Sequence, residues 1–87
     1  MKLSIFANDL YKLLYYMHSI EIEYKDRKII FDSQKEISNN IHFSLTKTNN
    51  LINELEKLGL LEKYSGKGKY YITSLGYKLL TLMDREI

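Results

Sequence analysis

The chain has 87 residues, which suits one small domain and is too short for two. It contains no cysteine and only two histidines, which argues against disulfides, thiol chemistry or a metal site, and we expect no cofactor. The formal net charge is only +2, but residues 1–43 carry six basic and six acidic groups whereas residues 44–78 carry six lysines against three glutamates, so the positive excess is local and favours a phosphate-bearing partner.

The first predicted element is an amphipathic helix that starts at about Ser4 or Asn8 and ends at His18. A small hairpin over residues 20–31 follows, because apolar and charged residues alternate over 20–25 and residues 28–31 are rich in β-branched and aromatic residues. The alternation predicts a half-buried first strand; a first helix that continues through Ile20 is the alternative. The apolar stripe of the helix consists of Phe6, Leu10, Leu13, Leu14 and Met17.

Two short helices come next. Ser33 and Glu36 have the spacing of a capping box at the start of a helix over 34–40, whose buried residues are Ile37 and Ile41. After a tight link at 42–43, Ser44 caps a third helix that ends at Gly59. The predicted inward residues of this helix are Thr48, Leu51, Ile52, Leu55 and Leu58.

The remaining residues predict a second hairpin and a last helix. Strand-like runs at 60–64 and 69–73 are joined by residues 65–68, whose two glycines supply the positive φ that a hairpin loop requires. Tyr70 and Tyr71 point to opposite faces, so we expect one of them in the core. Ser74 begins the last helix, with an apolar stripe made of Leu75, Leu79, Leu80, Met83 and Ile87.

Four motifs in this order carry a family resemblance: EIS at 36–38, IHFSLTKTNNLINELEKLGLLEK at 41–63, GKGKYYIT at 66–73, and the pair Thr73 and Gly76. The chain resembles a winged helix-turn-helix DNA-binding domain and is similar to MarR-like bacterial regulators over about two-thirds of its length. The resemblance implies one α+β, mainly helical domain over 1–87, with a three-helix core, a small β-hairpin wing and a C-terminal helix. The chain departs from the family at His42, where glycine is usual, and at Thr48, where valine or isoleucine is usual.

The resemblance implies that the helix at about 45–58 reads the DNA major groove. Three asparagines within five residues disfavour a helix, and contacts with bases or phosphates would offset that cost. Asparagine pairs with adenine, threonine and leucine contact thymine methyl groups, and lysine reaches guanine or phosphate. An exposed face that is merely solvated is the alternative. The predicted DNA-binding residues of this segment are Ser44, Leu45, Thr46, Lys47, Asn49, Asn50 and Asn53.

The predicted wing at about 61–73 carries Lys63, Lys67 and Lys69. We expect these lysines to contact the DNA backbone or minor groove, although lysines on a short hairpin also protect an exposed strand edge from aggregation.

The first helix is more aromatic than one buried stripe needs. Tyr11, Tyr15 and Tyr16, together with Leu82 of the last helix, suggest a homodimer formed through these two helices; ordinary amphipathic packing is the alternative. His18 and His42 are expected to be turn or surface residues.

The predicted function is sequence-specific binding of double-stranded DNA. The task is either transcription regulation or the marking of a plasmid or phage origin of replication or transfer (conjugation). The sequence shows no catalytic grouping, and GKG is too short for a P-loop, so we expect that the chain is not an enzyme. No apolar run approaches transmembrane length and no signal-peptide pattern is present, so we expect a cytoplasmic protein without membrane contact. A winged-helix protein–protein adaptor that does not bind DNA is the alternative.

Overall fold

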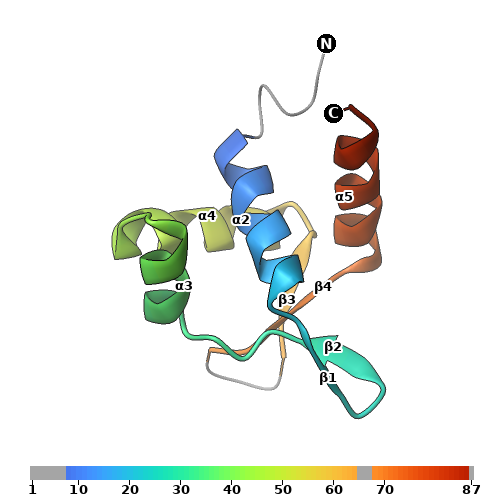
Figure 1. The fold of residues 1–87 in the computed structure, drawn as a ribbon, viewed down its shortest axis with the longest axis horizontal. Coiled ribbons are helices and arrows are strands. Elements are labelled where there is room, and N and C mark those ends of the chain that lie inside the picture. The colour runs from blue at the N-terminus through green and yellow to red at the C-terminus, as the bar shows by residue number, and fades with distance from the viewer. Residues whose placement is uncertain (1–7, 65–67, 87) are drawn as a thin grey trace.

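The computed structural model describes residues 8–64 and 68–86 of the 87-residue chain, and these form four helices and two two-stranded antiparallel sheets (Figure 1). The predicted α+β, mainly helical class and the order of the elements are confirmed. The elements are α2 (Asn8–Ser19), β1 (Ile22–Tyr24), β2 (Arg27–Ile29), α3 (Gln34–Ile41), α4 (Leu45–Lys57), β3 (Leu61–Lys63), β4 (Tyr70–Ile72) and α5 (Ser74–Glu86).

The predicted capping box at the start of α3 is confirmed. The Ser33 hydroxyl accepts a hydrogen bond from the Glu36 backbone N–H at 3.1 Å, and the Ser33 N–H donates to the Glu36 carboxylate at 2.8 Å. The helix ends at His42, whose backbone is left-handed with φ 65° and ψ 34°. The position where the family usually has glycine therefore does adopt the conformation that glycine favours.

Helix α4 begins and ends as predicted. The Ser44 hydroxyl accepts from the Lys47 N–H at 3.0 Å, and Gly59 has φ +76°. Two hydrogen bonds close the C-terminus, from the Gly59 N–H to the Glu56 carbonyl (3.0 Å) and from the Leu60 N–H to the Leu55 carbonyl (2.9 Å). This pair is the Schellman motif, which satisfies carbonyls that the helix leaves free.

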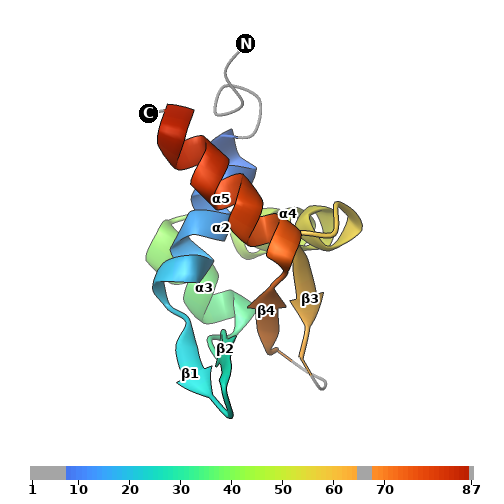
Figure 2. The same ribbon diagram turned by 90° about the vertical axis from the view of Figure 1, so that its right-hand side faces the viewer.

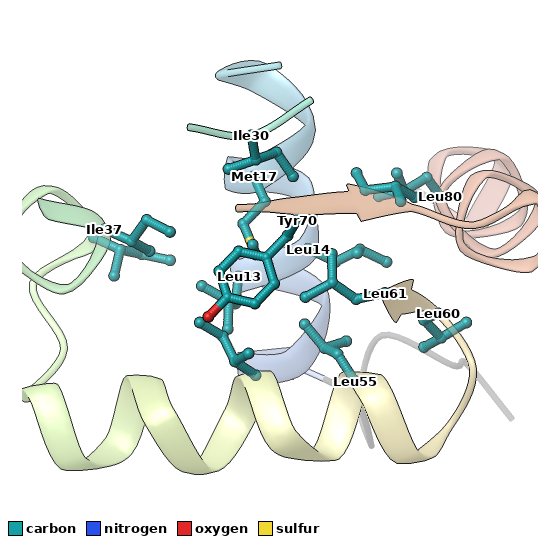
Figure 3. Close-up of a cluster of buried hydrophobic side chains, with 13 residues drawn as sticks. Leu13, Leu14, Met17, Ile30, Ile37, Leu55, Leu60, Leu61, Tyr70 and Leu80 are labelled. Atoms are coloured by element: carbon teal, nitrogen blue, oxygen red, sulfur yellow. The ribbon is translucent and has the colours of Figure 1, made fainter. Parts of the chain in front are cut away.

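The hydrophobic core lies between the four helices and the two hairpins (Figure 3). Several predicted stripe residues lie elsewhere: Leu58 is 49% exposed and Leu75 is 53% exposed, so both predictions were wrong. Leu58 follows the last turn of α4, and on α5 the buried face is centred on Gly76 and Leu80. The core side chains are Leu13, Leu14, Met17, Ile30, Ile37, Ile41, Ile52, Leu55, Leu60, Leu61, Tyr70, Ile72 and Leu80.

Other stripe residues show a mixed outcome. Leu10, Leu51 and Leu79 are partly buried and pack against the core. Phe6, Ile87 and the side chain of Met83 lie outside what the structure describes.

The first hairpin pairs β1 with β2 through a two-residue turn. Both turn residues, Lys25 and Asp26, have positive φ (51° and 64°), which is the backbone of a type I′ turn. Helix α2 ends at Ser19, so the predicted hairpin is confirmed and the longer first helix was wrong. The half-buried first strand was also wrong, because all three residues of β1 are exposed. Ile22 is 55% exposed since the core ends at β2.

The second hairpin pairs β3 with β4, and both hairpins extend from the same end of the molecule (Figure 2). A bridge between Ile30 and Tyr70 joins them, with N–H to carbonyl distances of 2.8 and 3.1 Å. Tyr70 is 3% exposed and Tyr71 is half-buried, so the prediction that one of the two tyrosines is in the core is confirmed.

The pair Thr73 and Gly76 joins the end of α4 to the start of α5. The Thr73 hydroxyl donates to the Gly59 carbonyl at 2.7 Å and accepts from the Gly76 N–H at 3.0 Å. A Cβ atom on Gly76 would lie 2.5 Å from the Leu60 carbonyl oxygen. Only glycine allows this close approach, which gives the Thr-x-x-Gly motif its physical reason.

Candidate nucleic-acid interface

Every residue predicted to bind DNA in the segment 44–53 is exposed, and Leu45 is 52% exposed. The inward residues of α4 are Thr48, Ile52 and Leu55. Because successive helix residues are about 100° apart, Thr46 and Asn50 lie on the outermost line, with Lys47 and Asn49 on opposite flanks. In the first two turns of α4 the outermost line therefore presents one hydroxyl and one amide.

A row of hydrogen-bonded amides runs along one flank of α4; we call it the amide row. The Asn53 Nδ2 donates to Asn49 Oδ1 at 3.3 Å, and the Asn49 Nδ2 donates to Gln34 Oε1 at 3.0 Å. The Gln34 Nε2 donates to the Tyr70 hydroxyl at 2.9 Å. The row thus connects α4, the first residue of α3 and strand β4.

The amide row lines a hollow of about 470 Å³ between α4 and the β3–β4 hairpin, which we call the amide hollow. Lys63 and Glu56 supply one cation and one anion to its wall, and Gly68 lies at its edge. The predicted Asn49, Asn53 and Lys63 are therefore brought together in one site. The lining consists of Gln34, Asn49, Asn53, Glu56, Lys63, Gly68 and Tyr70.

Lys47 is not part of this hollow. Its ammonium group lies 2.9 Å from the Asp9 carboxylate of α2 and 4.3 Å from the centroid of the Phe43 ring. Both partners lie beside the flank of α4 that is opposite the amide row. Lys47 is 44% exposed at its side chain, so the pair is weak, but Asp9 cancels much of its charge toward a phosphate.

Lys63 and Lys69 of the second hairpin are exposed, as predicted, whereas Lys67 lies outside the described residues. The Lys69 ammonium lies 5.7 Å from the centroid of the Phe31 ring. The hairpin is closed by the Tyr64 N–H, which donates to the Lys69 carbonyl at 2.9 Å.

The structure adds Arg27, which the charge count of the sequence missed. Its guanidinium lies 4.4 Å from the Tyr71 ring centroid and 5.5 Å from that of Tyr64. A hydrogen bond from the Tyr71 hydroxyl to the Glu62 carboxylate raises the pKa of Tyr71, and Arg27 opposes that shift. Arg27 belongs to the half of the chain with balanced charge, and the Ile30–Tyr70 bridge brings its hairpin beside the second one.

Gln34 was also missed by the sequence reasoning. It is the first residue of a capped helix, where polar residues are common, so its type carries no signal of its own. Its partners lie 15 and 36 residues further along the chain, and no local pattern predicts such contacts.

Thr48 is fully buried, and its hydroxyl has no hydrogen-bond partner within the described part of the chain. The departure from the usual valine or isoleucine at this position thus leaves an unsatisfied polar atom, which destabilises the core beside α4.

The surface formed by α2 and α5 exposes large apolar side chains. Tyr15 is 52% exposed and Leu82 is 49% exposed, whereas Tyr11 and Tyr16 pack partly against the core. A hollow of about 540 Å³ lies on α5, lined by Ser74, Tyr77, Lys78, Thr81 and Leu82. Of the four residues predicted to form a dimer contact, two are therefore occupied within the fold.

Two other kinds of feature are absent from the described residues. None of their helices is long and apolar enough to cross a membrane. They contain no group of three or more His, Cys, Asp or Glu side chains placed to hold a metal ion.

Comparison with known proteins gives the fold a context. No protein-family model matches the chain, and no curated protein sequence matches it. Among solved structures, the reduced CO-sensing protein from R. rubrum superimposes with a TM-score of 0.70 at 20% identity, over 91% of this chain and 39% of that protein. The likeness shows the fold.

Two other solved structures agree. A transcriptional regulator of the CRP/FNR family from Thermus thermophilus gives a TM-score of 0.64 at 19% identity, over 88% of this chain and 39% of its own. A CO-dependent transcription factor from Carboxydothermus hydrogenoformans gives 0.66 at 15% identity, over 91% and 38%. The chain spans about two-fifths of each of these proteins. The resemblance to MarR-like regulators in particular is not confirmed.

Proposed function

We propose that this chain is a winged helix-turn-helix domain that binds double-stranded DNA in a sequence-specific manner. The observation that carries the proposal is the uncovered outer face of α4, where small amides and a hydroxyl stand beside a lysine-bearing hairpin. Small polar side chains approach base edges closely, and lysines attract phosphate. Two of the structural neighbours are a transcriptional regulator and a transcription factor, which favours a DNA-binding function.

In this proposal α4 lies in the major groove and the β3–β4 hairpin is the wing. Thr46 and Asn50, at the crest of the helix, contact base edges, and Leu45 meets a thymine methyl group. Lys63, Lys67 and Lys69 contact the backbone or minor groove. The function is binding without catalysis, either in transcription regulation or at a plasmid or phage origin of replication or transfer.

The experiment is selection of bound duplexes from a random pool, followed by titration of the selected duplex at several salt concentrations. Asn50→Ala is expected to relax the base preference at one position. Lys63→Ala and Lys69→Ala are each expected to reduce the slope of log affinity against log salt by about one. Lys78→Ala on α5 is the matched control, since it removes a lysine away from α4. A chain that binds no duplex at low salt would contradict the proposal.

The apolar exposure of α2 and α5 favours a second proposal, a homodimer formed through these helices. Tyr15 and Leu82 are its central residues, and a domain with so small a core gains from burying them. Sedimentation of the wild type and of Leu82→Glu tests it, and an inverted repeat in the selected duplex supports it. If the chain is a monomer and binds no duplex, the adaptor function is favoured instead, with α5 as the contact for another protein.

A further inference from the structure

We propose that the amide hollow binds a single DNA phosphate, so that Asn49 and Asn53 hold the DNA backbone while Asn50 and Thr46 read the bases. This inference rests on the proposed function and divides the polar residues of α4 into two roles. The division follows from which amide groups are already hydrogen-bonded within the protein.

The hydrogen bonds of Asn49 are the first step. One of its two amide N–H groups donates to the Gln34 carbonyl, and its own carbonyl accepts from Asn53. Bidentate pairing with adenine needs the carbonyl and an N–H of one amide, both directed at the base. The amide row holds the Asn49 carbonyl and one of its two N–H groups along the flank of the helix, and leaves the second N–H free. Asn50 has no such bond among the described residues, so its amide is available to turn toward a base.

The second step is the balance of donors and acceptors in the hollow. Each amide has two N–H groups, and Gln34, Asn49 and Asn53 each use one within the row. Three amide N–H groups remain, together with the Tyr70 hydroxyl hydrogen and the Lys63 ammonium. The acceptor groups that receive no hydrogen bond within the row are the Asn53 carbonyl and the Glu56 carboxylate. The excess of donors favours an anion, and the single carboxylate favours a singly charged phosphodiester over a more highly charged group.

The third step is rigidity and position. Tyr70 is 3% exposed, so its hydroxyl anchors the row at a fixed point of the core (Figure 3). Gln34 holds the row between this anchor and α4, and acts as a positioning residue for Asn49. The hollow lies between α4 and the wing hairpin. A duplex that is read by α4 and touched by the wing has a sugar–phosphate strand between these two contacts.

The test is a methylphosphonate scan of the selected duplex, in which one phosphate at a time is made neutral. For the wild type, substitution at each contacted phosphate should weaken binding, and at the phosphate held in the amide hollow the expected loss is about tenfold, because hydrogen bonds to a charged group are lost. In Asn49→Ala and Gln34→Met, affinity is already lower for every sequence, the base preference is unchanged, and the same methylphosphonate has little further effect. Asn50→Ala is the control: its loss of affinity and the loss caused by the methylphosphonate are expected to add.

Either of two results would overturn this division. One is a relaxed base preference in Asn49→Ala; the other is additive losses for Asn49→Ala with every methylphosphonate. Both require a wild type that selects a motif, and therefore leave the proposed function intact. A wild type that binds no duplex removes the proposed function and the phosphate site together. Thermal unfolding of Asn49→Ala and Gln34→Met checks that both variants keep the wild-type fold.

Discussion

The two β-hairpins lie side by side, but different forces hold them against the helices (Figure 2). In the second hairpin Leu61, Tyr70 and Ile72 are buried in the core. In the first hairpin all of β1 is exposed, and Ile29 is the buried residue of β2. Burial of large apolar side chains anchors both strands of the second hairpin, whereas in the first hairpin it is confined to the end of β2, at Ile29 and the adjoining Ile30, and the rest depends on the Ile30–Tyr70 bridge and on polar contacts.

The polar contacts of the first hairpin centre on Glu21, the residue before β1. Its side chain is 3% exposed, it lies 2.6 Å from His18 Nδ1, and it accepts a hydrogen bond from the Tyr77 hydroxyl of α5. At the other end, Arg27 lies over the Tyr71 ring. The difference between the hairpins suits the proposed function, because the wing must keep a fixed position relative to α4 and the first hairpin need not.

The largest expected effect comes from shortening one isoleucine in each hairpin. Ile72→Ala removes a side chain that is 4% exposed and should lower the free energy of unfolding by about 3 kcal/mol. Ile22→Ala, at a position 55% exposed, should change it by less than about 0.5 kcal/mol. Urea unfolding of the two variants measures both values. Equal losses would show that the first hairpin is anchored by apolar burial as well.

The next effect tests the close contact at the base of the second hairpin. Gly76→Ala places a methyl group against the Leu60 carbonyl and the Ile72 side chain, and should cost about 2 kcal/mol. Gly68→Ala is the matched control: its Cβ meets nothing within 4 Å, but its φ of +67° makes alanine unfavourable by about 1 kcal/mol. A Gly76→Ala variant as stable as the wild type would show that this approach can relax.

The sequence predicted the second hairpin and the two preceding helices well because their signals are local. The Ser33–Glu36 capping box, the Ser44 cap and Gly59 each act within one helical turn, and all three are confirmed. The left-handed backbone of His42 was not predicted from the sequence, which showed only a histidine where the family usually has glycine. Local backbone chemistry thus determined where each helix begins and ends.

The first hairpin and the candidate site were predicted less well because they depend on contacts between distant residues. Alternation in 20–25 indicated a strand but not which face is covered, and here neither face of β1 is. The amide row joins residues up to 36 positions apart, and the Asp9–Lys47 pair joins two helices. The helical periodicity of the sequence identified the exposed side of α4. It could not show which polar groups of α4 are paired with residues of other elements.

A smaller effect is expected where the first hairpin is tied to α5. Burial and the hydrogen bond to Glu21 raise the pKa of Tyr77 well above its usual range. The neutral hydroxyl therefore stabilises the fold fully below about pH 10, the value of an unfolded tyrosine, and this contribution is lost as pH rises further. Tyr77→Phe should cost about 1.5 kcal/mol at pH 7 and show a weaker loss of stability above pH 10.

Urea unfolding at pH 7, 9 and 11 makes this measurement. Tyr15→Phe is the control, because its ring is 52% exposed and removal of its hydroxyl should change little. A loss at alkaline pH that is the same in Tyr77→Phe and the wild type would contradict the role of Glu21 and Tyr77 as the anchor of the first hairpin.

The smallest effect is a gain in stability at the turn of the first hairpin. Lys25 and Asp26 both have positive φ, which residues other than glycine adopt at a cost that is smallest for asparagine and aspartate. Replacing them with Asn-Gly, the preferred type I′ sequence, should raise the free energy of unfolding by about 1 kcal/mol. Lys28→Asn, which removes a lysine from β2 where φ is not positive, should give no gain. If the first hairpin unfolds together with the core, as the buried second hairpin does, the relieved turn should raise the urea midpoint. If it instead opens separately from the core, the gain would appear as slower hydrogen exchange within β1 and β2 and leave the urea midpoint unchanged.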